Sequence, residues 1–67
     1  MRKWMNINGY KIKLTKIVAI CPIKELEGEF FIEIYFSGEF LSIRMPSEEE
    51  AVKAHSHLTH KFYGESY

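Results

Sequence analysis

The stretch that decides the fold is EFFIEIYFSGEFLSIRM, residues 29–45. Two runs of strand-forming residues flank Ser37-Gly38, which is the usual arrangement of a β-hairpin with a two-residue turn. Pairing outward from that turn predicts seven opposed pairs: Phe36–Glu39, Tyr35–Phe40, Ile34–Leu41, Glu33–Ser42, Ile32–Ile43, Phe31–Arg44 and Phe30–Met45. Because a slip of one residue would exchange the two faces of the ribbon, this register is well specified.

Side chains alternate across a strand, so the ribbon has two faces of different composition. The inner face is apolar and is the predicted core: Phe30, Ile32, Ile34, Leu41, Ile43 and Met45. The outer face combines aromatic and polar residues: Phe31, Glu33, Tyr35, Phe40, Ser42 and Arg44. The rest of the chain offers one amphipathic helix, which can cover one face only. We therefore expect the outer face to be a surface made for a partner.

The segment before this ribbon predicts a smaller hairpin over residues 4–14. Asn8-Gly9 supplies the two positive-φ positions of a type I′ turn. One face of this hairpin is expected in the core: Met5, Ile7, Tyr10, Ile12 and Leu14. The other face carries Trp4, Asn6, Lys11 and Lys13. A third strand is expected at residues 17–21, ended by Pro22 because proline has no N–H for a ladder, and residues 22–28 are expected to form a loop.

A helix is predicted to begin after Ser47. The Ser47 hydroxyl can cap the first turn, and Glu50 stands at the position that completes a capping box. Gly64 is a plausible end of the helix. At 100° per residue one stripe carries Ala51, His55, Leu58 and Phe62, with Val52 and Thr59 beside it. Lys53, His57, His60 and Lys61 point largely away from that stripe.

The order hairpin, strand, hairpin, helix predicts an α+β fold. Residues 1–67 form a single small domain, in which a curled antiparallel sheet of four to five strands carries one C-terminal helix packed on one face. The alternative is that the sheet curls until the N-terminal hairpin folds over the outer face and closes a small barrel. In that case the outer aromatic rings would belong to the core.

At 67 residues the chain is near the lower limit for folding without disulfides or metal. Homo-oligomerisation would add the buried area that so short a chain lacks. The single cysteine cannot form an intrachain disulfide, which favours a reducing compartment. The basic start is not followed by the apolar run of a signal peptide, and no stretch is long enough to span a bilayer. We expect a cytoplasmic protein with no membrane contact and no cofactor.

Charge is segregated along a chain whose formal net charge is zero. Six basic and no acidic side chains lie in residues 1–24: Arg2, Lys3, Lys11, Lys13, Lys16 and Lys24. Residues 25–50 hold eight glutamates and one basic side chain, Arg44. We expect basic and acidic strands to become neighbours and to neutralise each other across the sheet. The alternative is a dipolar surface that orients a partner or a second copy of the chain.

No motif in the sequence names a reaction. The chain has no aspartate, no glycine-rich phosphate loop and no nucleophile elbow, so we expect that it is not an enzyme. His57 and His60 have the spacing of metal ligands on one helix face, but two imidazoles do not make a closed zinc site, and we predict no metal. His55 is expected to be a boundary histidine that is hydrogen-bonded to the backbone.

These observations favour a small binding module that acts through protein–protein contacts. We expect it to form a homodimer. In size and composition it is similar to the short proteins with which phages inhibit host proteins. Aromatic residues and arginine are enriched in such interfaces. The residues predicted to bind the partner are Trp4, Lys11, Lys13, Phe31, Tyr35, Phe40 and Arg44. One alternative is a binder of single-stranded nucleic acid or nucleotides, with rings stacking on bases and cations on phosphates. Another is an oligomer that sequesters a ligand between its subunits.

Overall fold

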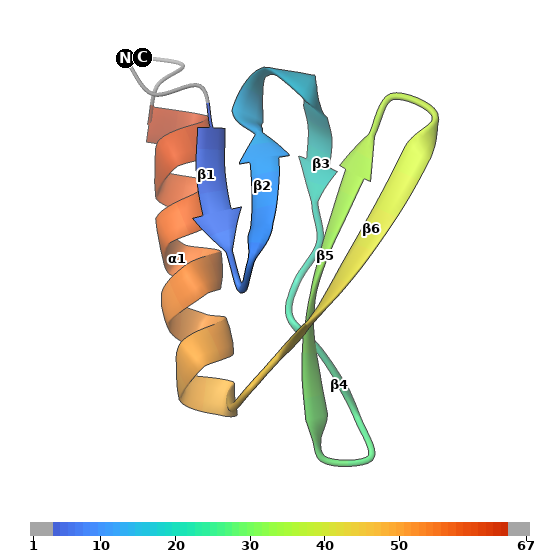
Figure 1. Ribbon diagram of the computed structural model, residues 1–67, viewed down its shortest axis with the longest axis vertical. Helices are drawn as coiled ribbons and strands as arrows, with labels where there is room; N and C mark the ends of the chain where they lie inside the picture. Colours follow the sequence, from blue (N-terminus) through green and yellow to red (C-terminus); the bar gives the residue numbers. More distant parts are fainter. Residues whose placement is uncertain (1–3, 65–67) are drawn as a thin grey trace.

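The computed structural model describes residues 4–64 of the chain (Figure 1). The fold is α+β, as predicted, with antiparallel strands followed by one C-terminal helix. The elements in chain order are β1 (Trp4–Ile7), β2 (Tyr10–Lys13), the 3-10 turn η1 (Leu14–Lys16), β3 (Ile17–Ile20), β4 (Lys24–Leu26), β5 (Glu29–Phe36), β6 (Glu39–Met45) and α1 (Glu48–Gly64).

Strand β5 is the centre of the main sheet. It pairs with β6 along its whole length, and all seven predicted pairs of this hairpin are confirmed. On its other side β5 pairs with two short strands, β3 beside its C-terminal half and β4 beside its N-terminal half. The β3–β5 ladder contains an irregularity between Ile17 and Ala19. The sheet is open, so the alternative of a closed barrel is wrong.

The loop predicted for residues 22–28 is wrong in its second half. Strand β4 pairs with the start of β5, and the turn between them is Glu27-Gly28. Both turn residues have positive φ, 51° and 81°, which is the geometry of a type I′ hairpin. Glutamate is an uncommon residue at the first of these positions, so the usual signal, asparagine or aspartate before glycine, is missing. Strand β3 ends before Pro22, and the chain pairs with β5 again from Lys24, where β4 begins.

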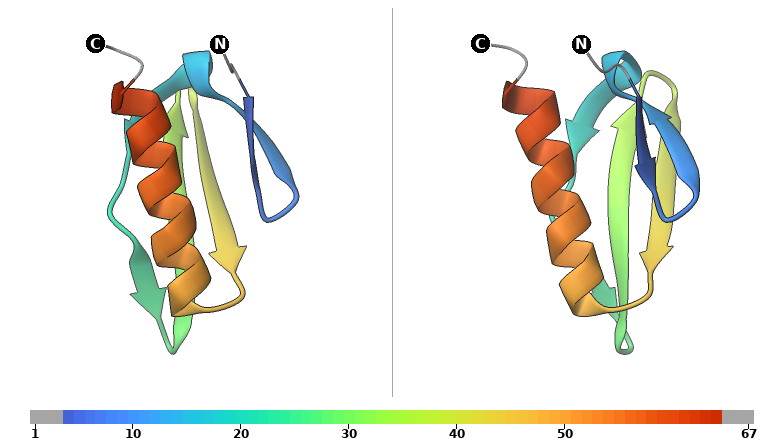
Figure 2. Two further views of the ribbon diagram at one scale, coloured as in Figure 1. Left: turned by 90° about the vertical axis from the view of Figure 1, so that its left-hand side faces the viewer. Right: turned by 60° about the vertical axis from the view of Figure 1, so that its left-hand side comes forward.

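The N-terminal hairpin forms a separate two-stranded sheet with the predicted register, Trp4 opposite Lys13 and Ile7 opposite Tyr10. Asn8 and Gly9 have φ values of 46° and 90°, as a type I′ turn requires. Figures 1 and 2 show this hairpin and α1 on the same side of the main sheet. The inner face of the β5–β6 ribbon therefore has two covers, and neither of them reaches the outer face.

The core lies between these three layers. It consists of buried apolar residues from every layer: Ile7, Ile12, Leu14, Ile17, Ile32, Ile34, Ile43, Met45, Ala51 and Leu58. Phe30 and Leu41 of the predicted core face are partly buried against this cluster. Tyr10, which was also expected in the core, is 48% exposed. Its cross-strand neighbour Ile7 and its strand neighbour Ile12 are both buried, so the exposure on this face is confined to the Tyr10 side chain.

Helix α1 begins as predicted. The Ser47 hydroxyl oxygen accepts a hydrogen bond of 3.2 Å from the backbone N–H of Glu50. Ala51 and Leu58 are fully buried and His55 is half-buried, which confirms the predicted stripe. Val52 is exposed instead of flanking the core, because the apolar stripe is completed on its other side by Ala54.

His55 joins the helix to the sheet. Its Nε2 atom lies 2.9 Å from the backbone carbonyl oxygen of Cys21, in a partly buried position. Because a carbonyl oxygen can only accept, the ring nitrogen is the donor in this hydrogen bond. The predicted role of His55 as a boundary residue bound to the backbone is therefore confirmed.

Candidate interaction surface

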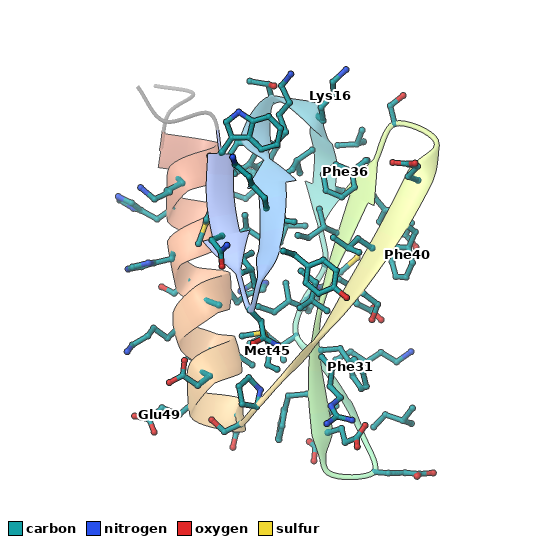
Figure 3. The ribbon with its side chains drawn as sticks, viewed as in Figure 1. Lys16, Phe31, Phe36, Phe40, Met45 and Glu49 are labelled. Atoms are coloured by element: carbon teal, nitrogen blue, oxygen red, sulfur yellow. The ribbon has the colours of Figure 1, made fainter. Side chains whose placement is uncertain are left out.

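The outer face of the main sheet is uncovered within residues 4–64. Tyr35 and Phe40, which stand opposite each other on β5 and β6, are 47% and 49% exposed. Their ring centroids are 4.7 Å apart and the ring planes are tilted by 49°. Figure 3 shows Phe31 and Phe40 on one side of the β5–β6 ribbon and Phe36 and Met45 on the other. Tyr35 and Phe40 thus form an apolar surface that the described residues leave open to solvent.

The other end of the outer face is a shallow groove around Phe31. This ring is half-buried because strand β4 runs beside it. The groove has a volume of about 190 Å³ and is lined by Lys24, Leu26, Phe31, Glu33 and Ser42. Lys24 and Leu26 were not among the predicted partner-binding residues, because their segment was expected to be a loop. Lys24, Glu25 and Leu26 show no alternation of polar and apolar residues, so the glycine of the Glu27-Gly28 pair is the signal that could have suggested a turn after a strand here.

Polar contacts on the outer face are few and weak. Lys24 Nζ lies 3.9 Å from Glu33 Oε2, and the Ser42 hydroxyl donates a hydrogen bond of 3.4 Å to the same carboxylate. Arg44 Nη1 lies 3.5 Å from Glu29 Oε2, with both side chains largely exposed. Exposed ion pairs of this kind contribute little to stability. Their charges therefore remain available to contacts with another molecule.

The seven predicted binding residues fall on two separate surfaces. Phe31, Tyr35, Phe40 and Arg44 share the outer face of the main sheet. The remaining residues, Trp4, Lys11 and Lys13, lie on the N-terminal hairpin, whose buried side packs onto the inner face of that sheet. Their side of the hairpin therefore points away from the outer face (Figure 2).

The expected neutralisation of charge across the sheet is wrong for most of the lysines that the structure describes. Strands β1 and β2 pair only with each other, so no acidic strand lies beside them. Lys11 and Lys13 instead place their ammonium groups 5.3 Å and 5.6 Å from the centre of the Trp4 ring. Among residues 4–64, the only ion pairs are Lys24–Glu33 and Arg44–Glu29. The positive charges of the N-terminal segment are left without carboxylate partners in the described part of the chain.

The histidines do not gather into a cluster. His57 and His60 are exposed on the helix, whereas His55 is turned toward Cys21. Within the described residues, no group of three histidine, cysteine or acidic side chains is placed to hold a metal ion.

Between Trp4 and Gly64, no helix has both the length and the apolar character that crossing a membrane would require.

Comparison with known proteins gives no match of any of three kinds. No family model matches the sequence, no characterised protein is significantly similar to it, and no solved structure matches its fold significantly.

Proposed function

We propose that this protein is a binding module without catalytic activity, and that the outer face of its main sheet binds a second copy of the same chain. The observation that supports this most directly is the exposure of Tyr35 and Phe40 on a face that neither α1 nor the N-terminal hairpin covers. Exposed rings that form a contiguous patch mark interaction sites more often than scattered apolar residues do.

The outer face is complementary to itself. Tyr35 and Phe40 lie toward the β5–β6 turn, whereas Phe31 lies at the opposite end beside Lys24 and Arg44. A two-fold axis perpendicular to the strands makes the strands of the two copies antiparallel. Each aromatic pair then rests on the phenylalanine and the cations of the other copy, where ring–ring and cation–π contacts are favourable. Such an isologous contact forms a closed dimer.

The distribution of charge over the whole molecule favours the same orientation. The molecule is elongated, 35 Å along its longest axis. Lys16 lies at one end of this axis and Glu49 at the other (Figure 3). The β4–β5 turn, with its three glutamates in residues 25–29, lies at the same end as Glu49 (Figure 1). In an antiparallel dimer the basic end of each copy lies beside the acidic end of the other, which steers association.

The size of the surface sets the expected strength of the dimer. Strand β5 has eight residues, β6 has seven, and β3 and β4 together have seven along the other edge, which gives a face of roughly 14 Å by 24 Å. A face of this size buries less than the roughly 800 Å² per partner of a standard interface. We therefore expect a reversible dimer with a Kd in the micromolar range, on the order of −8 kcal/mol or weaker.

Sedimentation velocity over a range of concentrations tests this proposal. Phe40→Glu replaces a ring that rests on the other copy with a charge and should shift the protein to monomer at every accessible concentration. The matched control is Val52→Glu, because Val52 is 52% exposed on the helix, away from the main sheet. This control should leave the dimer unchanged. Circular dichroism of both variants verifies that each still folds.

A second variant distinguishes a second copy from any other partner. The two-fold axis passes near Glu33, so the Glu33 carboxylates of the two copies approach each other and repel. Glu33→Gln should therefore tighten the dimer, whereas a surface meant for a different protein gives no reason to expect this. A wild-type protein that stays monomeric up to about 1 mM would contradict the proposal.

A further inference from the structure

A second candidate site lies on the N-terminal hairpin, away from the outer sheet face. A groove of about 270 Å³ separates this hairpin and η1 from the β5–β6 turn. We call it the lysine groove, because its lining combines three lysines with three aromatic residues: Lys11, Lys13, Lys16, Trp4, Tyr10 and Phe36. Its lining includes none of the four outer-face residues of the proposed dimer contact, Phe31, Tyr35, Phe40 and Arg44.

The three lysines of the groove lack carboxylate partners among residues 4–64. Two of them lie over the same ring, Lys11 at 5.3 Å and Lys13 at 5.6 Å from the centre of Trp4. Concentrating like charges in this way is unfavourable in the free protein. An anion that entered the groove would relieve this repulsion, so the site is suited to a negatively charged ligand.

The aromatic residues narrow the chemistry of that ligand. Trp4 and Tyr10 are 45% and 48% exposed, and Phe36 is half-buried. Exposed rings beside lysines are the combination with which proteins hold single-stranded nucleic acid, the rings stacking on bases and the cations contacting phosphates. Because Lys11 and Lys13 are two residues apart on one strand, their Cα atoms are about 7 Å apart. Neighbouring phosphates of an extended strand can follow such a spacing.

We propose that the lysine groove binds a short stretch of single-stranded nucleic acid, with bases on Trp4 and Tyr10 and phosphates on the three lysines. Glu39, which also lines the groove, opposes this binding through its negative charge. The overall charge of zero is compatible with the proposal, because six glutamates lie in residues 25–29 and 48–50, and the β4–β5 turn and the beginning of α1 are at the other end of the molecule (Figure 1).

The experiment uses the single tryptophan of the chain, Trp4, which lies in the groove itself. Titration with a thymidine oligomer of about 12 nucleotides should quench its fluorescence, because a stacked base contacts the ring directly. The slope of log Kobs against log salt concentration should be about −2, as expected for three phosphate contacts on a single strand.

Variants on the groove make the test sharper. Lys11→Gln combined with Lys13→Gln should weaken binding and reduce the salt slope to about −0.7. Glu39→Gln should tighten binding. The matched control is Lys53→Gln, an exposed lysine on α1 that does not line the groove. Tyr35→Glu should leave oligonucleotide binding unchanged whether or not the protein dimerises, so this result separates failure of one proposal from failure of the other.

Two results would overturn the inference. The first is the absence of quenching at low salt with the wild-type protein. The second is equal binding of polyglutamate and the oligonucleotide at the same salt concentration, which would make the groove a site for acidic protein segments. Quenching that the lysine pair abolishes and that polyglutamate does not reproduce supports it.

Discussion

The inner and outer faces of the β5–β6 ribbon belong to the same two strands but differ in how far their side chains are buried. On the inner face Ile32, Ile34 and Ile43 have no exposed surface at all. On the outer face Tyr35 and Phe40 expose nearly half of theirs. The inner residues are branched aliphatic side chains that fill space between layers, whereas the outer ones are flat rings flanked by charge.

The two faces differ in burial because both of the other layers, α1 and the N-terminal hairpin, pack on the same face of the sheet. Both α1 and the N-terminal hairpin lie on the inner side (Figure 2), so two covers share one face. Between Trp4 and Gly64 there is no further element that lies on the other side. The aliphatic face is therefore the one that folding buries, and the aromatic face is the one that we propose for binding. Substitutions can test this division.

The largest expected effect comes from the inner face. Ile43→Ala should lower the free energy of unfolding by about 2 to 5 kcal/mol, because Ile43 is fully buried and the cavity cannot be filled. Phe40→Ala, three residues earlier on the opposite face, should cost less than about 1 kcal/mol. Urea denaturation at a concentration where the monomer dominates measures both values. Equal losses would show that the outer ring is part of the core.

The next effect concerns the attachment of the helical cover to the sheet. His55→Ala removes the donor to the Cys21 carbonyl oxygen and should cost about 1 to 3 kcal/mol, because that oxygen is left partly buried without this bond. His57→Ala on the exposed side of α1 is the control and should change stability by about 0.5 kcal/mol at most. The comparison is made by thermal unfolding at one pH. Similar losses of stability in the two variants would mean that the hydrogen bond from His55 to Cys21 does not stabilise the fold.

A smaller effect is expected at the beginning of the same helix. Ser47→Ala removes the acceptor for the backbone N–H of Glu50 and should cost about 1 kcal/mol. Ser56→Ala is a suitable control, because Ser56 is exposed in the helix interior, where alanine is the better helix former. Chemical denaturation should therefore move the two midpoints in opposite directions. A loss of stability in both variants would argue against the cap.

The parts of the fold that could be predicted are those in which neighbouring residues decide the outcome. The two-residue turn and the alternation of side chains between the two faces of each strand specify the register of residues 29–45, and every predicted pair is present. Ser47 caps the helix for a similarly local reason. In each case the chemistry that decides lies within a few residues of the element itself.

The parts that could not be predicted depend on which segments meet in space. Strand β4 forms because β5 extends beyond β3 and offers it a free edge. Tyr10 is exposed although Ile7 and Ile12 on the same face of the hairpin are buried, a difference that the alternation of the sequence does not contain. The lysines of β2 remain unpaired because the N-terminal hairpin forms its own sheet, and this separation split the predicted binding residues into two surfaces.

The smallest effect lies on the outer face itself. Tyr35 and Phe40 form a cross-strand pair with ring centroids 4.7 Å apart, and such pairs contribute roughly 0.2 to 1 kcal/mol. A double-mutant cycle of Tyr35→Ala and Phe40→Ala should give a coupling of this size in the monomer. The control cycle pairs Phe40→Ala with Val52→Ala, whose sites share no contact and should be additive. If the dimer forms as proposed, the same cycle measured on association should give a coupling several times larger, because each ring then contacts the partner copy as well as its neighbour. Equal coupling in folding and in association would mean that the pair serves the hairpin alone.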